Sequence, residues 1–501
     1  MSGIFINSDA WNFWLDNQGN MTADAVRKDV EFYAAQGGVE GIFYNMNFQR
    51  SFYPTKVGTP IWKDCEILED GSVTLRGEKL PPDVADEYRA MIAGGKELNE
   101  KVPDFMQIRY DHCKKIGVEM WHSMRMNDVH WTPLGQEFRP QHCDLWVERK
   151  DLLRAWYRHT QRSIWHDNAF DYGKQEVYDY HIAMVREYLL DYESDGIELD
   201  WLRACPVFKP GYDEINTPIF TQFMRDVRKA ADEAAEKWGH RVRVAARVPT
   251  YVDEAMGMGM DVAAWCREGL IDILSPGPIH HHTEQDTQVQ LWRLIAPEPV
   301  ILAPCVNCTA MSAPGWSIES VNESDFGFVS NFYQQGADTI YVYNHFQGHG
   351  RRYPQIHEFF RLAGDRAAVA KEHRRHILTK HLPAGEGVFE RSCYPCAVWA
   401  KCCNGGIKIN CGEGTEGRSA RIILGTTREV DVDVLLNTVK CELLPADTPL
   451  PSVMPGKSAY YVQAKVPAGI LHDGWNDVEL FNNGEKDINE NEFVWLEVEI
   501  F

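Results

Sequence analysis

Two acidic residues, Glu198 and Asp200, lie two positions apart in the apolar run DGIELDWLR, which begins at Asp195. In a β-strand, alternate side chains point to the same face, so these two carboxyl groups share one face while Ile197 and Leu199 take the other. Carboxylates are seldom buried unless they are paired or functional. Two carboxyl groups about 6.5 to 7 Å apart along a strand titrate as a coupled pair, in which one is pushed toward the acid and the other stays ionised. This is the chemistry of general acid and base catalysis.

A structural role for the two carboxylates is the competing interpretation. The same alternation turns Arg243 and Arg247, in the run RVRVAARV, to the inner face of the next predicted strand. An inward arginine beside an inward carboxylate forms an ion pair. The pair on the strand therefore predicts either a site or an internal salt bridge.

The elements that position this pair alternate between short β-rich runs and amphipathic helices as far as about residue 365, the pattern of parallel strands connected by helices. Eight such units predict an α/β fold, the (β/α)8 TIM barrel, whose catalytic residues lie at the C-terminal ends of the strands. Long insertions after the second strand (49–102) and the third (127–172) are expected to rise at that rim. The predicted strands begin at Gly3, Glu40, Gly117, Asp195, Arg241, Ile271, Pro299 and Asp338, and the predicted helices span 23–36, 103–115, 176–192, 217–238, 261–269, 286–295, 318–335 and 354–362.

The pattern changes after about residue 375. Alternating β runs such as GGIKINCG, SAYYVQAKV and FVWLEVEIF are separated by Gly, Asp and Asn, without a convincing long helix. Runs of this kind at this spacing predict an antiparallel β-sandwich. The expected organisation is a catalytic barrel over residues 1–370 followed by an accessory β-sandwich domain over residues 371–501.

Three longer blocks carry a resemblance to a known family: FDYGKQEVYDYHIAMVREYLLDYESDGIELDWLR, GMGMDVAAWCREGLIDILSP and YQQGADTIYVYN. They resemble the glycosyl-hydrolase-like family 10 barrels, a group within the TIM-barrel glycosidases, over about residues 1–365. The resemblance implies a (β/α)8 fold and hydrolysis of glycosidic bonds, and it puts Asp200 at the acidic position of the fourth strand. A looser similarity is to the DGxDxDxE signature of chitinase-type barrels, but Leu202 stands where that signature has its general acid.

Most glycosidases need a second carboxyl group beside the scissile bond. We expect Asp200 to act as nucleophile or base, while Asp128, in the loop after the third strand, or Glu198 protonates the leaving oxygen. The reverse assignment, with Asp200 as the acid and Glu198 as the stabilising charge, is also open. Further acidic candidates at strand ends are Asp9, Glu284 and Asp286.

Several other residues at strand ends suit sugar binding. Aromatic faces stack on sugar rings, and amide or imidazole groups reach hydroxyl groups. Arginines there either pair with the site carboxylates or recognise a uronate or sulfate group bidentately. The candidates are the aromatic residues Trp11, Trp121 and Tyr343, then His345, Asn45 and Asn47, and the arginines Arg125, Arg203 and Arg247, whereas Trp201 is turned outward by the alternation.

Composition excludes several other classes of protein. A formal net charge of -22 and a pI near 5.3 argue against binding to nucleic acid or to an anionic membrane. The sequence has no apolar run long enough for a membrane span and no secretion signal at its start, so it predicts a cytoplasmic protein. The expected partner is a carbohydrate, and a homo-oligomer is left open.

No metal or cofactor is expected. The pairs Cys305/Cys308 and Cys393/Cys396 fall in different predicted domains, and the consecutive histidines 280–282 cannot all converge on one ion. The sequence also lacks GxGxxG, Walker and GxSxG motifs.

The hypothesis is that the protein is a glycoside hydrolase. Its alternatives are a non-catalytic carbohydrate-binding barrel and a carbohydrate lyase that uses Tyr343 and His345 as base and acid.

Overall fold

The protein is described by a computed structural model, which defines residues 3–34, 37–132, 138–158, 165–279, 282–343, 356–382, 397–456 and 459–501. Its first part is built on a nine-stranded sheet in which every pair of neighbouring strands is parallel. All eight predicted strands are present. The sheet contains β1 (Ile4–Ser8), β2 (Val39–Asn45), β6 (Glu119–Arg125), β7 (Gly196–Asp200), β8 (Arg243–Pro249), β9 (Ile273–Gly277), β11 (Ile301–Leu302), β12 (Cys305–Val306) and β15 (Tyr341–Val342).

The two ends of this sheet belong to one stretch of chain. The strand order is β11-β9-β8-β7-β6-β2-β1-β15-β12, and only Ala303 and Pro304 separate β11 from β12. The run that the sequence predicts as one seventh strand is thus two short strands. Pro304 has no backbone N–H to donate to a sheet ladder, which accounts for the interruption. The sheet and its helices form a TIM-like arrangement of β/α units.

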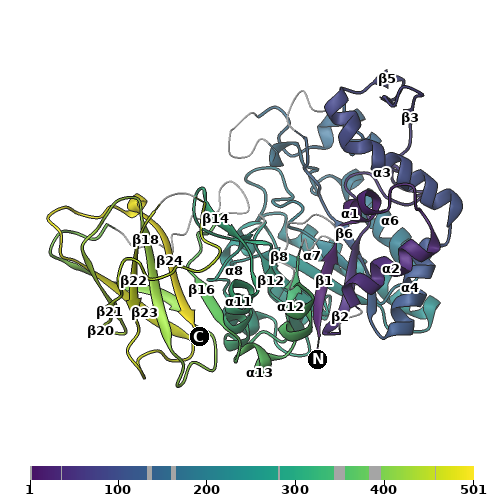
Figure 1. Cartoon of the computed structure of the whole chain (residues 1–501). Helices are drawn as coiled ribbons and strands as arrows, with labels where there is room; N and C mark the ends of the chain where they lie inside the picture. Colours follow the sequence, from purple (N-terminus) through teal and green to yellow (C-terminus); the bar gives the residue numbers. More distant parts are fainter. Residues whose placement is uncertain are drawn as a thin grey trace.

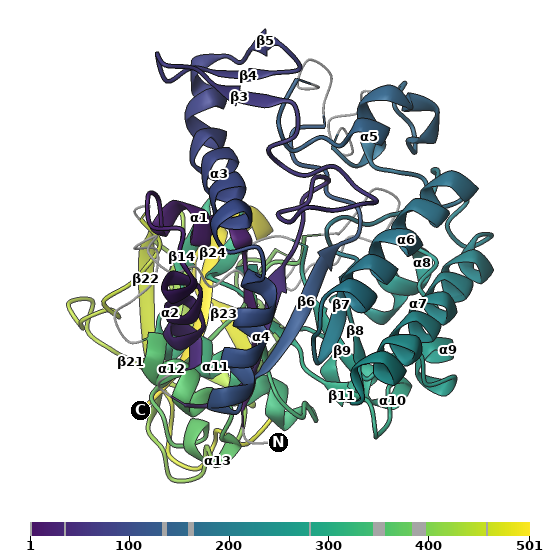
Figure 2. The same cartoon turned by 90° about the vertical axis from the view of Figure 1, so that its right-hand side faces the viewer.

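The alternation of side chains predicted for β7 is confirmed by the packing. Ile197 and Leu199 belong to the main apolar core, which they share with side chains of the surrounding helices. The opposite face of the sheet carries a separate aromatic-rich cluster that includes Phe5, Trp121 and Tyr341. Figure 2 shows α6 and α7 side by side outside β7 and β8. The helices that cover the sheet are α2 (Ala23–Ala34), α4 (Phe105–Ile116), α6 (Gln175–Asp191), α7 (Thr217–Trp238), α9 (Val262–Arg267), α10 (Val289–Ile295), α11 (Asn322–Gln334) and α12 (Ile356–Ala363), each close to its predicted span.

The two long insertions contain secondary structure that the sequence analysis did not predict. The insertion after β2 folds into the small sheet β3 (Cys65–Ile67), β4 (Val73–Leu75) and β5 (Glu78–Lys79), followed by α3 (Pro82–Lys101). The insertion after β6 includes α5 (Asp144–Glu148). The two insertions are tied together because Asp144 accepts salt bridges from Lys63 at 2.8 Å and from Arg76 at 2.6 Å. Figures 1 and 2 show β3, β5 and α3 projecting beyond the end of β6.

The C-terminal part consists of two antiparallel sheets. The predicted antiparallel β-structure is present, and both sheets contribute alternate residues to one apolar core. Figure 1 shows these strands in yellow and green beside the parallel sheet. One sheet contains β16 (Arg374–Ile377), β24 (Phe493–Ile500), β18 (Ala420–Thr426), β22 (Tyr460–Lys465) and β21 (Glu442–Leu443), and the other contains β17 (Cys403–Asn410), β23 (Trp475–Asn482), β19 (Val432–Leu436) and β20 (Val439–Lys440).

Helix α11 connects the two parts by packing against β16. At the contact, a Cβ atom added to Gly327 would lie 2.2 Å from the carbonyl oxygen of Arg375, so only glycine lets the helix approach this strand. A second small sheet, made of β10 (His282–Thr283), β13 (Thr309–Ala313) and β14 (Trp316–Glu319), also lies at this junction, where the Ser312 hydroxyl donates to the carbonyl oxygen of Val494.

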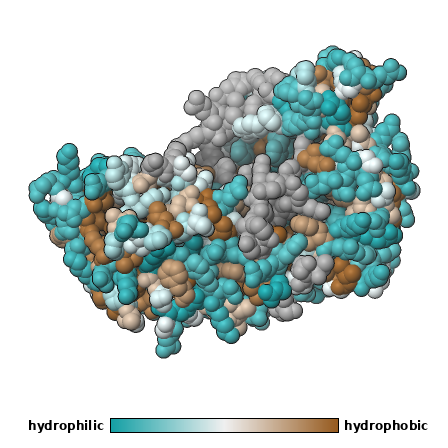
Figure 3. All heavy atoms as spheres, viewed as in Figure 1, coloured by the Kyte–Doolittle hydropathy of each residue, from teal (hydrophilic) through white to brown (hydrophobic). Residues whose placement is uncertain are grey.

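The surface of the described residues is largely hydrophilic on the face shown in Figure 3. None of the helices in the described ranges is both long and apolar enough to cross a membrane. Figure 3 shows one face on which hydrophilic residues predominate and hydrophobic residues are scattered in small groups. Isolated apolar residues of this kind are normal on protein surfaces.

Candidate active site

The candidate site is set by the register of three neighbouring parallel strands. Strand β7 pairs with β6 on one side and with β8 on the other, so the inward side chains form layers across the sheet. Asp200 ends β7 and lies in the layer nearest the carboxyl ends of the strands, and Glu198 lies in the layer below. From the carboxyl end downward, the layers are Arg125–Asp200–Arg247, Ser123–Glu198–Ala245 and Trp121–Gly196–Arg243.

Asp200 is buried, with 1% of its surface exposed, and both of its carboxylate oxygens are hydrogen-bonded. Oδ1 accepts from Nη1 of Arg247 at 2.9 Å and from the backbone N–H of Leu202 at 3.1 Å. Oδ2 accepts from the hydroxyl group of Tyr343 at 3.0 Å. A guanidinium, a hydroxyl and a backbone N–H all stabilise the ionised carboxylate.

Glu198 has the opposite environment. It is also 1% exposed, but neither carboxylate oxygen makes a hydrogen bond of normal geometry with the described residues. Burial, followed by the nearby charge of Asp200, raises the pKa of Glu198 from 4.5 to about 7, although the hydroxyl groups of Ser123 and Tyr341 lie near enough to lower it somewhat. Glu198 therefore keeps its proton to a higher pH than an ordinary glutamate does.

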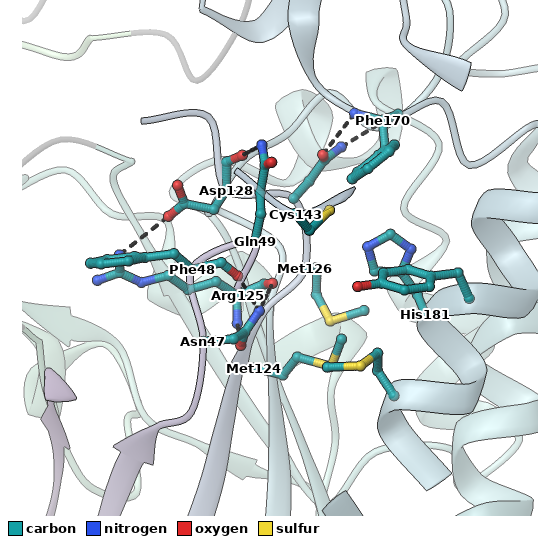
Figure 4. A pocket seen from close by; sticks show the side chains of 13 residues that line it. Asn47, Phe48, Gln49, Met124, Arg125, Met126, Asp128, Cys143, Phe170 and His181 are labelled. Carbon is teal, nitrogen blue, oxygen red and sulfur yellow. Dashed lines mark hydrogen bonds and ion pairs between the residues drawn. The ribbon is translucent and has the colours of Figure 1, made fainter. Parts of the chain in front are cut away.

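Arg125 gathers two further predicted acids at the same rim. Its Nη2 donates to Asp9 Oδ2 at 2.7 Å and its Nη1 donates to Asp128 Oδ2 at 3.2 Å. The guanidinium also lies 4.9 Å from the ring centroid of Phe48. Figure 4 shows the Arg125–Asp128 pair together with Asn47, whose side chain bonds the backbone N–H and C=O of Arg125, each at 3.1 Å. Asn47 thus fixes the end of β6.

Asp128 is poorly suited to donate a proton. It is 2% exposed and accepts from Nδ1 of His130 at 2.9 Å as well as from Arg125. Burial by itself would raise the pKa of Asp128, but His130 and Arg125 outweigh burial and hold the pKa well below its usual range. The small cavity beside Asp128, lined by Gln49 and Phe170 among others, has room for about one water molecule.

Arg203 and Tyr343 complete the rim around Asp200. Nε of Arg203 donates to the Tyr343 hydroxyl group at 2.8 Å, and this hydroxyl donates to Asp200. The guanidinium of Arg247 lies 3.6 Å from the ring centroid of Tyr343. Burial raises the pKa of Tyr343 to about 12, with the charge of Asp200 also raising it and Arg203 lowering it. Tyr343 is therefore a hydrogen-bond donor at neutral pH, which is the wrong protonation state for the base of a lyase.

The other residues considered for sugar binding, Trp121, Asn45 and Trp201, lie in different environments. Trp121 lies in the bottom layer, fully buried, where it stacks on Phe43 with ring centroids 4.7 Å apart, so it is part of the interior packing and its faces are not available to a sugar. Asn45 ends β2, is 3% exposed, and has a side-chain oxygen without a hydrogen bond to the described residues. Trp201 packs on Phe220 on the outer side of the sheet, as predicted.

Glu284 belongs to a separate cluster. It is fully buried and accepts from His282 Nε2 at 3.1 Å, His381 Nδ1 at 3.1 Å and the backbone N–H of Leu382 at 3.1 Å. Burial alone would raise the pKa of Glu284, but the two histidines hold it well below its usual range. This cluster ties β10 to the segment after β16, and in the described part of the chain it has no contact with Asp200.

Two predicted residues cannot be placed in the site. Trp11 lies in α1 (Ala10–Asp16), but its side chain is outside the described residues. His345 is likewise outside the described residues, as are Cys393 and Cys396. Within the ranges that the structure defines, no group of three or more His, Cys, Asp or Glu side chains is arranged to hold a metal ion.

Two further residues, which were not predicted from the sequence, lie beside Glu198. Tyr341 and Ser123 bring hydroxyl groups toward its carboxyl group. Tyr341 lies two positions before Tyr343, which follows β15, and Ser123 lies two positions before Arg125 on β6. The same alternation that turned Glu198 inward could have identified them.

No family model and no curated protein matches the chain. Solved structures similar to it include the chitinase ChiW of Paenibacillus sp. str. FPU-7, at 12% identity and a TM-score of 0.40 over 99% of this chain and 54% of the chitinase. The alpha-amylase of Lactobacillus plantarum is similar at 12% identity and a TM-score of 0.40 over 95% of this chain and 98% of the amylase. Chitinase ChiA74 of Bacillus thuringiensis is similar at 10% identity and a TM-score of 0.39 over 100% of both chains. This chain spans about half the length of ChiW, and similarities at this level identify neither a family nor a reaction.

Proposed function

We propose that the protein is a glycoside hydrolase whose parallel sheet closes into a (β/α)8 barrel over residues 1–370, followed by a β-sandwich over residues 371–501. Closure is supported by the pairing of β11 with β9 and of β12 with β15, because β11 and β12 are consecutive pieces of one strand. A barrel closed in this way places the carboxyl ends of β6, β7 and β8 at its mouth, where enzymes of this fold carry their catalytic groups.

The observation that carries the proposal is the pair of inward carboxyl groups on β7 in contrasting environments. Asp200 accepts hydrogen bonds from Arg247, Tyr343 and the backbone N–H of Leu202, whereas burial and the charge of Asp200 raise the pKa of Glu198 to about 7. Glycoside hydrolysis needs one carboxylate to act as nucleophile, base or stabilising charge and one carboxylic acid to protonate the leaving oxygen. We assign the first role to Asp200 and the second to Glu198.

Asp128 is the weaker candidate for the acid. A general acid must hold its proton near the working pH, which requires a raised pKa. The ion pairs of Asp128 with Arg125 and His130 act in the opposite direction. Its role in the proposal is to hold Arg125 in place beside Asp200.

The test is a screen of aryl glycosides and natural oligosaccharides with the wild type, Asp200→Asn, Glu198→Gln and the control Glu66→Gln, which alters an exposed carboxyl group in the insertion. We expect Asp200→Asn to lower kcat by about 10²-fold or more on every substrate that is cleaved. Glu198→Gln is expected to lower kcat by about 10² to 10⁴-fold on natural oligosaccharides, but much less on dinitrophenyl glycosides, whose leaving group needs no proton.

Unchanged turnover in Asp200→Asn would refute the assignment of the charged group. Equal losses in Glu198→Gln on natural and dinitrophenyl substrates would show that Glu198 is not the acid. The control Glu66→Gln is expected to match the wild type on both kinds of substrate.

A second candidate function is supported by the same contacts. Asp200 is 1% exposed and both of its carboxylate oxygens are bonded to Arg247, Tyr343 and the backbone N–H of Leu202, an arrangement that also suits a barrel that binds a sugar without cleaving it. Calorimetric titration with the same oligosaccharides separates the two functions, since a binding protein gives heat of binding with no product in the wild type.

A further inference from the structure

The three arginines near Asp200 differ in their partners. Arg125 is paired with Asp9 and Asp128, and Arg247 is paired with Asp200. Arg203, by contrast, has no carboxylate partner among the residues that the structure defines. The sequence left open whether these arginines pair internally or recognise an acidic ligand. Arg125 and Arg247 pair internally, and Arg203 is the one that could contact an acidic ligand.

Arg203 is nevertheless held firmly in place. Its backbone N–H donates to the carbonyl oxygen of Asp200 at 3.2 Å, and its carbonyl oxygen accepts from the N–H of Asn127 at 2.5 Å. Its Nε donates to the Tyr343 hydroxyl at 2.8 Å. Within the described ranges, neither of its terminal amino groups makes a hydrogen bond, and the residue is only half-buried. An arginine fixed by its backbone and its Nε presents its two terminal amino groups as a rigid fork.

Such a fork has a definite chemical complement. Two parallel N–H groups of a guanidinium match the two oxygens of a carboxylate, or two oxygens of a sulfate, better than they match a neutral hydroxyl group. The other cations of the rim cannot take this role without first breaking their ion pairs with Asp9, Asp128 or Asp200. Because Tyr343 connects Arg203 to Asp200, a group bound at this fork lies next to the proposed catalytic carboxylate.

We propose that Arg203 binds an anionic group of the sugar, so that the ligands of this site are acidic saccharides carrying uronate or sulfate groups. The identification of this ligand as the substrate rests on the proposed hydrolase function. The binding of an acidic saccharide does not rest on that function. A binding experiment therefore tests the role of Arg203 separately from hydrolysis.

The experiment is a calorimetric titration of the full chain with three acidic probes: oligogalacturonate, oligomannuronate and a sulfated galactose disaccharide. Each is paired with a neutral counterpart, the methyl ester of the uronate or the desulfated disaccharide. We expect the wild type to bind at least one acidic probe about tenfold or more tightly than its neutral counterpart, since a hydrogen bond to a charged group is stronger than one to a neutral group. The probe that binds distinguishes uronate from sulfate recognition.

Three variants make this test specific. Arg203→Met is expected to abolish the preference for the acidic probe, and Arg203→Lys is expected to keep part of it, because lysine retains the charge without the fork. Arg225→Met is the matched control, since Arg225 is an exposed arginine of α7 paired with Glu268. Its preference should equal that of the wild type. The thermal unfolding midpoint of each variant shows whether it is folded.

Each result has a definite meaning. Equal affinity for acidic and neutral probes, no binding of any acidic probe, or an unchanged preference in folded Arg203→Met would overturn the inference. If acidic saccharides bind through Arg203 but are not cleaved, the proposed hydrolase function fails and the inference stands. If neutral glycosides are cleaved by an enzyme with no preference for acidic ones, the inference fails and the hydrolase function stands.

Discussion

At the scale of single residues, Glu198 and Asp200 show how two carboxyl groups of one strand acquire different environments. They are equally buried, and the difference lies in their partners. Asp200 accepts hydrogen bonds from Arg247, Tyr343 and a backbone N–H, whereas burial and the charge of Asp200 raise the pKa of Glu198 more than the nearby hydroxyl groups of Ser123 and Tyr341 lower it. The difference follows from position, because Asp200 lies in the layer that contains Arg125 and Arg247, whereas Glu198 lies one layer below, between Ser123 and Ala245.

The raised pKa of Glu198 predicts that the stability of the fold depends on pH. The pKa of Glu198 is raised from 4.5 to about 7, so the folded chain binds a proton that the unfolded chain releases between these values. The contribution of protonated Glu198 to the free energy of unfolding is therefore fully present below about pH 4.5 and is lost as the pH rises through 7. The penalty at pH 8 is on the order of 3 kcal/mol, and we expect Glu198→Gln to remove it.

Urea unfolding of the wild type and Glu198→Gln at pH 5 and pH 8 measures this effect. We expect the variant to be more stable than the wild type at pH 8, with the advantage shrinking at pH 5. Glu66→Gln, in an exposed position of β3, serves as the control and should follow the wild type at both values. If Glu198→Gln and the wild type had the same free energy of unfolding at both pH values, ionisation of Glu198 would carry no cost in the folded protein.

At the scale of elements, the contact between α11 and β16 depends on Gly327. A Cβ atom at this position would lie 2.2 Å from the carbonyl oxygen of Arg375, and a backbone carbonyl cannot rotate away as a side chain can. We expect Gly327→Ala to lower the free energy of unfolding by about 1 to 3 kcal/mol, as overpacking of a close contact does. The matched control is Gly257→Ala in α8 (Val252–Gly257), where nothing lies within 4 Å of the added atom.

The comparison uses chemical unfolding of both variants. Gly257→Ala is expected to be neutral or slightly stabilising, because alanine is favoured over glycine in a helix by about 1 kcal/mol. A loss in Gly327→Ala no larger than the change in Gly257→Ala would mean that α11 and β16 can separate without cost.

The elements themselves could largely be predicted because their signals are local. The alternation in DGIELDWLR and the helical period between 217 and 238 are readable within a few residues, and α7 spans Thr217–Trp238 as expected. The insertion after β2 was harder to predict, since β3, β4 and β5 are two or three residues long. Strands of this length carry too few alternations to stand out.

The partners of the site residues could not be predicted, because ion pairs join distant parts of the chain. Arg125 and Asp9 are 116 residues apart in sequence, and Glu284 and His381 are 97 apart. Alternation shows that a side chain faces inward, but it does not show which opposite charge it meets. For this reason the sequence could name Arg125, Arg203 and Arg247 together without separating the paired arginines from Arg203.

At the scale of the whole molecule, the parallel sheet and the C-terminal sheets are joined by more than a linker. Strand β16 follows the last helices of the first part, pairs with β24 in the C-terminal sheet and packs against α11. Arg375 of β16 is buried and donates to Glu497 of β24 at 2.7 Å. The junction therefore includes a helix of one part, a strand of the other and a buried ion pair.

A junction of this kind predicts that the two parts unfold together. Differential scanning calorimetry of the full chain is expected to show one transition, because exposure of β16 would uncover the face of α11 and an ion pair that is 2% or less exposed on both sides. Glu497→Gln leaves Arg375 as a buried charge without its carboxylate, which typically costs about 3 to 5 kcal/mol.

Since the ion pair lies within the C-terminal sheet, the variant also tests how far the coupling extends. If the two parts are coupled through α11 and β16, Glu497→Gln lowers the midpoint of the single transition as a whole. Two separate transitions in the wild type, or a variant in which only part of the heat absorption moves to lower temperature, would show that the parallel sheet keeps its stability independently of the C-terminal sheets. In that case α11 would contribute to the contact without coupling the two parts.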